Sequence, residues 1–215
     1  MDIILNTIEV RVLGSLMEKE LATPEYYPLS LNALVNACNQ KTNRSPVLSL
    51  DENKVAGALQ SLKEKHLVFQ SDAGRVSKYW HDFFKQNNLI RREAALLCLL
   101  LLRGPQTAGE LRSRTERLCS FENIEEVLQH LDNLEGIGFV RKLPRQAGQK
   151  EQRFAHLLAG EPENIDQVYS RQEPIMITVE ADNDRIAELE KSVAYLKEEM
   201  ETLKNEFLSF KKEFE

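Results

Sequence analysis

The stretch VAGALQSLKEKHLV (residues 55–68) decides the fold, because it recurs 72 positions later as VLQHLDNLEGIGFV (residues 127–140) with its apolar positions kept. In each stretch the first apolar residue is followed by others four and seven positions further on, which places all three on one face of an α-helix. An apolar pair ends each stretch and begins a strand pattern. The sequence therefore predicts two copies of one unit, in which a helix runs into a strand.

The residues around the first stretch predict the rest of the first copy. Asn6, Ser30 and Ser49 stand where the N-cap residues of three helices are expected. A β-hairpin is expected around the turn at residues 72–75. The expected order in this copy is therefore helix, helix, helix and hairpin.

The second copy begins with a helix over residues 91–102, which is apolar almost all round and is expected to be the central buried helix. Thr107 is the expected cap of a short second helix, and Ser120 the expected cap of a third, which runs to residue 135. A hairpin with a loop at residues 144–150 follows. The order of elements is that of the first copy.

This order is that of a winged helix-turn-helix domain. We therefore predict an α+β, mainly α-helical protein with tandem winged helix-turn-helix domains at residues 1–88 and 89–158. Each copy is small but lies within the size range that folds alone. A linker is expected at residues 159–181 and a C-terminal amphipathic coiled-coil helix at residues 182–215.

Four motifs resemble those of the YceH-like bacterial family. They are YPLSLNAL (residues 27–34), ACNQKTNR (37–44), LRGPQTAGELR (102–112), and LPR (143–145) with GQKE (148–151). The resemblance covers about residues 1–160 and implies a tandem winged-helix fold. It supplies no catalytic or binding residues that could be carried over to this sequence.

The C-terminal segment has apolar residues separated alternately by three and four positions, which is the a/d seam of a coiled coil. The predicted self-association residues are Ile186, Leu189, Val193, Leu196, Met200, Leu203, Phe207 and Phe210. Oppositely charged residues flank most of this seam, so we expect a homodimer through the C-terminal helix. The alternative is that the helix folds back onto its own body as an ordinary amphipathic surface helix.

The charges are unevenly distributed along the 215 residues, whose formal net charge is −6. Residues 1–88 carry ten basic and ten acidic side chains, residues 89–160 eleven and nine, and residues 161–215 seven and fifteen. The acidity is therefore in the tail, and a nearly neutral body leaves nucleic acid possible as a partner.

Composition also predicts the location of the protein. Three widely spaced cysteines without a CxxC pair indicate neither a disulfide framework nor a zinc site, so we expect the reducing cytoplasm. The longest apolar run has nine residues, which is too short for a membrane span, and no secretory signal is evident.

Candidate nucleic-acid contacts are polar and basic residues on the presumed DNA-facing elements. In the first copy they are Asn39, Gln40, Lys41, Asn43 and Arg44 in the turn and Lys54 on the third helix. In the second copy they are Arg112 and Arg114 on the short second helix, and Arg141, Lys142, Arg145 and Lys150 in the wing. Asn, Gln and Arg suit base edges, and clustered cations suit phosphates.

Two observations oppose this interpretation. An Asn-rich turn also satisfies its own backbone through Asx turns and caps, so the turn residues could be purely structural. The third helix of the second copy opens with Glu122, Glu125 and Glu126, which would repel phosphate even though carboxylates near a helix N-terminus are stabilising. The DNA and structural interpretations of the turn remain equally open at this point.

No pattern of catalytic residues is present. The sequence has no HExxH, no GxxxxGK[ST] and no third glycine after Gly136 and Gly138, so we expect no enzyme, no metal and no cofactor. The expected function is duplex DNA binding as a regulatory or architectural factor. The alternative is a protein-interaction scaffold without nucleic acid, since fold alone does not decide between these uses. A ligand-sensing regulator is a third possibility, for which the sequence singles out no residues.

Overall fold

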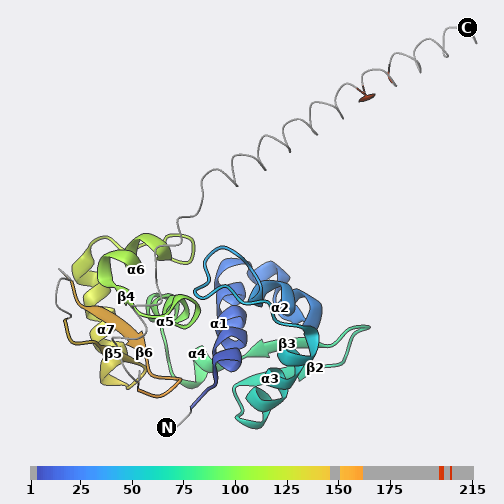
Figure 1. Cartoon of the computed structure of the whole chain (residues 1–215), viewed down its shortest axis with the longest axis horizontal. Coiled ribbons are helices and arrows are strands. Elements are labelled where there is room, and N and C mark those ends of the chain that lie inside the picture. The colour runs from blue at the N-terminus through green and yellow to red at the C-terminus, as the bar shows by residue number, and fades with distance from the viewer. Residues whose placement is uncertain (1–3, 146–150, 162–198, 201–203, 205–215) are drawn as a thin grey trace, which may run out of the picture. The chain divides into compact units, whose positions relative to one another are not determined.

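The structure, a computed structural model, describes residues 4–145, 151–161, 199, 200 and 204, and it is an α+β protein in which helix predominates (Figure 1). The first half contains α1 (Thr7–Ala22), the 3₁₀ turn η1 (Pro24–Tyr26), β1 (Leu29–Ser30), α2 (Leu31–Cys38), α3 (Glu52–Glu64), β2 (Val68–Ser71), β3 (Lys78–His81) and α4 (Phe83–Gln86). The second half contains α5 (Arg91–Arg103), β4 (Gln106–Thr107), α6 (Ala108–Thr115), α7 (Ile124–Gly136), β5 (Val140–Lys142) and β6 (Arg153–His156).

Both halves have the same topology, so the repetition predicted from residues 55–68 and 127–140 is present. The order helix, strand, helix, helix, strand, strand occurs twice along the chain. Each half builds a three-stranded antiparallel sheet whose last strand is central, in the orders β1-β3-β2 and β4-β6-β5. The short first strand pairs with the last in equivalent register, Leu29 opposite Tyr79 and Gln106 opposite Phe154.

Helix caps confirm three of the predicted helix starts. Asn6 caps α1 in a capping box with Glu9, Ser30 caps α2, and Thr107 caps α6 in a capping box with Glu110. In each case the side-chain oxygen accepts a backbone N–H of the first turn, which would otherwise lack a partner.

Two predicted caps are wrong. Asp51 rather than Ser49 caps α3, because the backbone N–H and C=O of Leu50 are both bonded to the Asn39 side chain and so are not available to a helix. Asn123 rather than Ser120 caps α7. Arg112 donates to the carbonyl oxygens of Phe121 and Glu122, which holds that stretch outside the helix.

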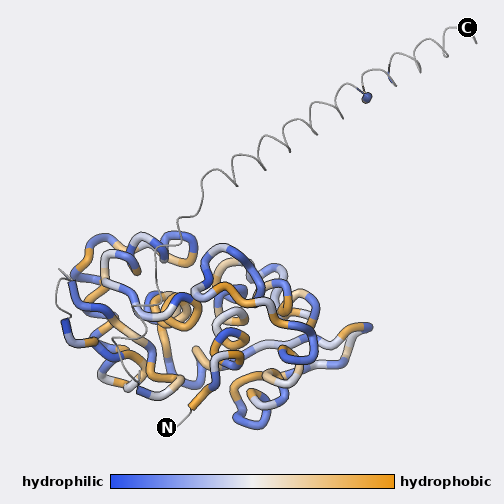
Figure 2. The backbone as a smooth tube through the Cα atoms, in the orientation of Figure 1, coloured by the Kyte–Doolittle hydropathy of each residue, from blue (hydrophilic) through white to orange (hydrophobic). Residues whose placement is uncertain are grey.

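α1 and α5 pack against each other at the centre of the compact unit formed by residues 1–163. Figure 1 shows α3, β2 and β3 on one flank of this pair and α7, β5 and β6 on the other. The run from Glu93 to Leu102 on α5 is buried on all sides, as predicted, and is strongly hydrophobic (Figure 2). One hydrophobic core extends through both halves, and the rings of Phe83 and Phe139 lie 5.2 Å apart between them.

The predicted domain boundary between residues 88 and 89 stays a prediction, as does the linker at residues 159–181. Residues 164–215 form a second unit, and the predicted coiled-coil seam falls in it, almost entirely outside the described residues. Only Met200 of that seam is described, and it is helical and 68% exposed. Within the described ranges no helix is long and apolar enough to cross a membrane.

Gly14 and Gly57 offer a matched test of the helix contacts. A Cβ on Gly14 would lie 3.0 Å from Leu102 Cδ2 and 3.2 Å from Leu101 Cβ, whereas one on Gly57 would meet nothing within 4 Å. We expect Gly14→Val to lower the free energy of unfolding by about 1–3 kcal/mol through overpacking. Gly57→Ala should raise it by about 0.5–1 kcal/mol, since alanine stabilises an exposed helix interior. Urea denaturation measures both, and an unaffected Gly14→Val protein would contradict close α1–α5 packing.

Candidate nucleic-acid interface

The loop between α2 and α3, residues 39–51, contains most of the first-copy residues predicted to contact DNA. The Asn39 side chain joins its two ends, accepting from the N–H of Leu50 at 2.7 Å and donating to its carbonyl at 2.8 Å. Ser45 N donates to Leu102 O at 2.9 Å, which ties the middle of the loop to α5. The loop is therefore a structural connection between the two halves.

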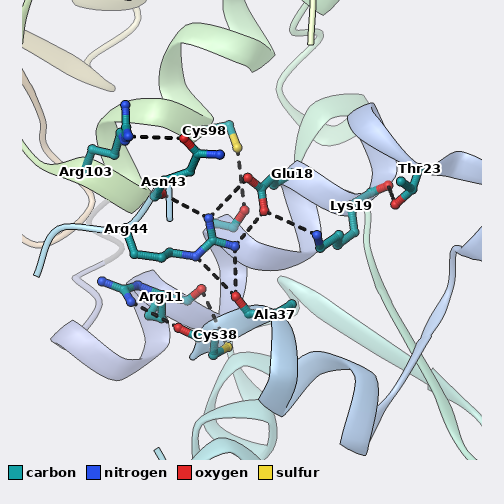
Figure 3. A network of polar contacts seen from close by, with 11 residues as sticks. Arg11, Glu18, Lys19, Thr23, Ala37, Cys38, Asn43, Arg44, Cys98 and Arg103 are labelled. Carbon is teal, nitrogen blue, oxygen red and sulfur yellow. Dashed lines mark hydrogen bonds and ion pairs between the residues drawn. The ribbon is translucent and has the colours of Figure 1, made fainter. Parts of the chain in front are cut away.

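Arg44 is the centre of a polar network under this loop (Figure 3). Its two terminal nitrogens donate to the two carboxylate oxygens of Glu18 on α1, at 3.1 and 2.6 Å. The same guanidinium donates to the carbonyls of Ala37 and Asn43. The Arg44 side chain is 0% exposed and that of Glu18 is 11% exposed, so this is a buried, bidentate ion pair.

A second arginine, Arg11, binds carbonyl oxygens at the C-terminal end of α2 and in the loop that follows it. Arg11 donates to the carbonyl oxygens of Cys38 at 3.1 Å and Pro46 at 2.6 Å. Two cations therefore meet the last carbonyls of α2, where the helix lacks intrahelical donors and its dipole favours positive charge.

These contacts show which of the predicted turn residues are bonded within the protein and which are accessible to a partner. Arg44 cannot reach a DNA molecule, because its guanidinium is buried and all of its donors face the protein; that prediction is corrected. The amide of Asn39 is bonded to the backbone, and the side-chain oxygen of Asn43 accepts from Arg103 at 3.1 Å. Of the predicted turn contacts, Gln40 and Lys41 remain, and both line a cavity beside α6.

The exposed face of α3 presents polar residues. Val55, Ala58, Leu59 and Leu62 are buried on its inner face, while its exposed residues are Glu52, Asn53, Lys54, Gly57, Gln60 and Glu64. Lys54 forms an exposed ion pair with Asp51 at 3.3 Å, with both side chains 56% exposed. Such a pair contributes little to stability and leaves the ammonium accessible.

The hairpin that follows α3 carries two cations that are not among the residues the sequence predicts for DNA binding. Arg75 and Lys78 are exposed, and neither has an ion pair or side-chain hydrogen bond within the described part of the chain. They stand alone rather than in a run of basic residues, so charge clustering did not reveal them. Their signal is position, because Arg75 lies in the turn of the hairpin that follows α3 and Lys78 begins its second strand, β3.

The two predicted arginines of α6 make contacts within the second half. Arg112 bonds the carbonyls before α7, as described above, and Arg114 donates to Gln106 Oε1 at 2.7 Å and pairs with Glu110 at 3.4 Å. Both residues are exposed, yet their donors are partly used. Their roles include holding β4, α6 and the start of α7 together.

The predicted wing cations on the second hairpin differ from one another in their contacts and exposure. Arg141 forms an ion pair with Glu161, and Lys142 Nζ lies 5.9 Å from the centre of the Phe154 ring. Arg145 is exposed, and Lys150 lies outside the described residues. This hairpin is basic, but part of its charge is balanced by neighbouring groups.

α7 is an acidic helix next to this hairpin. It carries Glu125, Glu126, Asp132 and Glu135 and has no lysine or arginine. Arg92 pairs with Glu126 at 2.7 Å, and Glu135 accepts from the backbone N–H of Lys142 at 3.0 Å. The exposed face of α7 therefore differs in charge from that of α3, although the two helices occupy equivalent positions in the repeat.

Among the described residues there is no group of three or more side chains suited to hold a metal ion. The cysteines Cys38 and Cys98 are buried, and burial raises the pKa of both thiols. Both groups are therefore poor nucleophiles where they lie.

The sequence is similar to a group of bacterial proteins along nearly its whole length. A UPF0502 protein of Solibacter usitatus is 54% identical over 209 residues, which cover 96% of this chain and 100% of that protein. A UPF0502 protein of Geobacter sulfurreducens is 52% identical over 200 residues, 91% of each chain, and one of Psychromonas ingrahamii is 45% identical over 210 residues, 95% of this chain and 97% of that protein. The family model described as "Protein of unknown function, DUF480" matches residues 5–149. The chain therefore belongs to the DUF480 family of bacterial proteins, whose curated relatives bear the name UPF0502.

Proposed function

We propose that this protein binds duplex DNA as a regulatory or architectural factor through two winged-helix domains. The observation that carries the proposal is the combination in the first half of a helix with a polar outer face, α3, and a hairpin with two accessible cations, Arg75 and Lys78. In a winged helix, such a helix enters the major groove while the wing contacts flanking phosphates.

The roles of the first-half residues follow from their chemistry. Asn53 and Gln60 on α3 have amides that can both donate to and accept from base edges, and Lys54 supplies a charge for phosphate or guanine. The Gln60 amide donates to Glu64 at 3.0 Å, so a contact with a base through that N–H would replace Glu64 as its partner. Gly57 lies between them without a side chain, so the DNA can approach the helix backbone closely. Arg75 and Lys78 would contact the phosphate backbone.

The second half has a different role in this proposal. β5, which ends at Lys142, lies on the α7 flank (Figure 1), so Lys142 and Arg145 would contact the phosphates of a second stretch of duplex, whereas the acidic α7 would not enter a groove. α3 and α7 lie on opposite flanks of the α1–α5 pair (Figure 1), so one half reads DNA without α7 facing the same duplex. Self-association through the predicted C-terminal seam would then supply a second α3, and sedimentation velocity of the full chain measures that association.

DNA binding is tested by charge reversal on the two hairpins. Fluorescence anisotropy of the full chain with mixed-sequence duplex, at about 50 and about 200 mM salt, should show steep salt dependence, because phosphate contacts release counterions. We expect the pair Arg75→Glu and Lys78→Glu to weaken binding to every sequence and to reduce the log–log salt slope by about one unit per lost contact. We expect the pair Lys142→Glu and Arg145→Glu to weaken binding to every sequence and to flatten the salt slope as well, and unchanged affinity would remove the second hairpin from the interface.

Lys85→Glu is the matched control. Its side chain is 84% exposed on α4 and belongs to neither hairpin, so its reversal changes net charge without removing a proposed contact. Lys85→Glu changes the net charge by two and each hairpin pair by four, so weakening by Lys85→Glu of half that of a pair, in free energy, would show that only net charge matters. Absence of any salt-sensitive binding at the lower salt concentration would refute the DNA function.

A protein-interaction scaffold, using the winged-helix domains and the coiled coil without nucleic acid, is the second candidate function. Its supporting observation is the outer face of α7, where Glu125, Asp132 and Glu135 lie between two exposed apolar residues, Ile124 (40% exposed) and Ile137 (53% exposed). An acidic surface with exposed apolar ends suits a basic protein partner better than DNA. This function predicts that the full chain shows no salt-sensitive DNA affinity in the same titration.

A further inference from the structure

A cavity of about 340 Å³ lies between the two halves of the compact unit. Its walls come from the end of α1, the loop after α2, α5 and the end of α6. The lining residues are Glu18, Lys19, Ala22, Thr23, Gln40, Lys41, Thr42, Asn43, Leu99, Arg114, Arg117 and Leu118. This volume is at the lower end of the range for small-molecule sites.

The charge on these walls is predominantly positive. Four cations line it, Lys19, Lys41, Arg114 and Arg117, against one lining carboxylate, that of Glu18, which is already paired with the buried Arg44. Lys19 also pairs with Glu18, at 3.8 Å, and Arg114 pairs with Glu110 behind the wall, at 3.4 Å. Lys41 and Arg117 are exposed and have no ion pair within the described residues. The cavity therefore holds more positive charge than its own acidic groups neutralise.

Arg103, which lies behind the cavity wall, adds to the positive charge around the cavity. Arg103 donates to the side chain of Asn43, which lines the cavity. Burial, together with the nearby cations Arg114 and Arg44, lowers the pKa of the Arg103 guanidinium. Glu110 and Glu18 partly offset this effect, and a bound anion would favour the charged form of Arg103 further.

The remaining lining residues suit a ligand with an anionic end and a less polar end. Thr42, Gln40 and Asn43 can donate hydrogen bonds, and Leu99 and Leu118 from the second half form an apolar part of the wall. Arginine pairs bidentately with phosphate, and lysine contacts it as a point charge. Phosphate carries more charge and more acceptor oxygens than a single carboxylate, so it suits Lys41 and Arg117 together better than a carboxylate does.

We propose that this cavity binds a small phosphorylated molecule, held by Lys41 and Arg117 from opposite halves of the protein. The ligand would join the loop after α2 to the end of α6 and so stabilise the contact between the two halves. This binding would occur whether or not the protein binds DNA. The phosphate bound by Lys41 and Arg117 could also belong to a DNA backbone, and the experiment distinguishes a small phosphorylated molecule from DNA.

The experiment is isothermal titration calorimetry of the full chain with inorganic phosphate, pyrophosphate and adenosine monophosphate, with acetate as the comparison at equal ionic strength. We expect the phosphate-bearing probes to bind and acetate not to bind. The double variant Lys41→Gln and Arg117→Gln should weaken their binding about tenfold or more, because hydrogen bonds to charged groups are among the stronger ones. Both residues are exposed and form no ion pair with any residue that the structure describes, so this variant should fold normally.

The double variant Arg75→Gln and Lys78→Gln is the control, since it removes the same charge elsewhere. It should keep the affinity for the phosphate-bearing probes. No heat of binding at about millimolar probe concentrations, or equal weakening in both variants, would overturn the proposal. It would also be overturned if the Lys41 and Arg117 variant lost duplex affinity while keeping that for the small probes, since the cations would then serve the DNA backbone.

Discussion

Replacing Glu18 with alanine is expected to lower the free energy of unfolding by about 3–5 kcal/mol, because it leaves a buried guanidinium without its counter-ion. The Arg44 side chain is fully buried, and Glu18 accepts from both of its terminal nitrogens. The other partners of Arg44, the carbonyls of Ala37 and Asn43, are neutral and cannot compensate for the lost charge. Chemical denaturation of the full chain measures the change.

Two further variants make this result specific to the buried pair. Glu18→Gln keeps the size of the side chain and one hydrogen-bond acceptor, so we expect a smaller loss than for alanine. Lys85→Ala breaks the pair with Asp82, which is 3.8 Å long and has an 84% exposed lysine, and should change stability by less than about 0.5 kcal/mol. A loss for Glu18→Ala no greater than that for Lys85→Ala would show that Arg44 is not held as described.

Replacing Phe83 with alanine is expected to lower the free energy of unfolding by about 3–5 kcal/mol and to destabilise both halves together. Phe83 is 0% exposed, and its ring lies 5.2 Å from that of Phe139 in the other half. Because one core extends through α1, α5 and both sheets, a cavity at this point removes contacts from each half. Ile137→Ala, at a 53% exposed position near Phe139, is the control and should have little effect.

Hydrogen exchange of α3 and α7 at increasing urea concentration is the measurement that separates a shared core from two independent ones. If the halves unfold as one cooperative unit, the most protected amides of the two helices converge on the same free energy of opening, and Phe83→Ala lowers both equally. A loss confined to the α3 amides would show that the halves unfold separately, in agreement with independent domains at residues 1–88 and 89–158.

The local architecture of this protein could be predicted from sequence because it depends on local periodicity. The spacing of Val55, Leu59 and Leu62, repeated from Val127, places apolar side chains on one helix face whatever the surroundings, and the recurrence of that spacing indicated two copies. Helix starts were predictable where one capping residue had no competitor, as at Asn6 and Thr107. They were mispredicted at Ser49 and Ser120, where a side chain from elsewhere held the intervening backbone.

Within the candidate site, the type of a polar residue did not indicate whether its side chain binds another part of the protein or is accessible to a ligand. Arg44 and Lys41 are three positions apart in the same motif, yet one is buried on Glu18 and the other is exposed at a cavity. Nothing in the motif distinguishes them, because the carboxylate that binds Arg44 lies 26 positions earlier on α1. Arg75 and Lys78 show the reverse, since their accessibility comes from the hairpin and not from any run of charge.

The sequence by itself determined the three main helices and the hairpin of each copy, their repetition and the position of the buried helix α5, since these follow from patterns over a few positions. It did not predict β1 and β4, which pair with strands about fifty positions further along the chain. Only the tertiary structure decided which polar groups satisfy one another and which remain available. Glu18, Lys41, Leu99 and Arg117 meet around one cavity because α1 and α5 bring the two halves together. Electrostatic and hydrogen-bonding partners are chosen by distance in space, and spacing along the chain does not encode that distance.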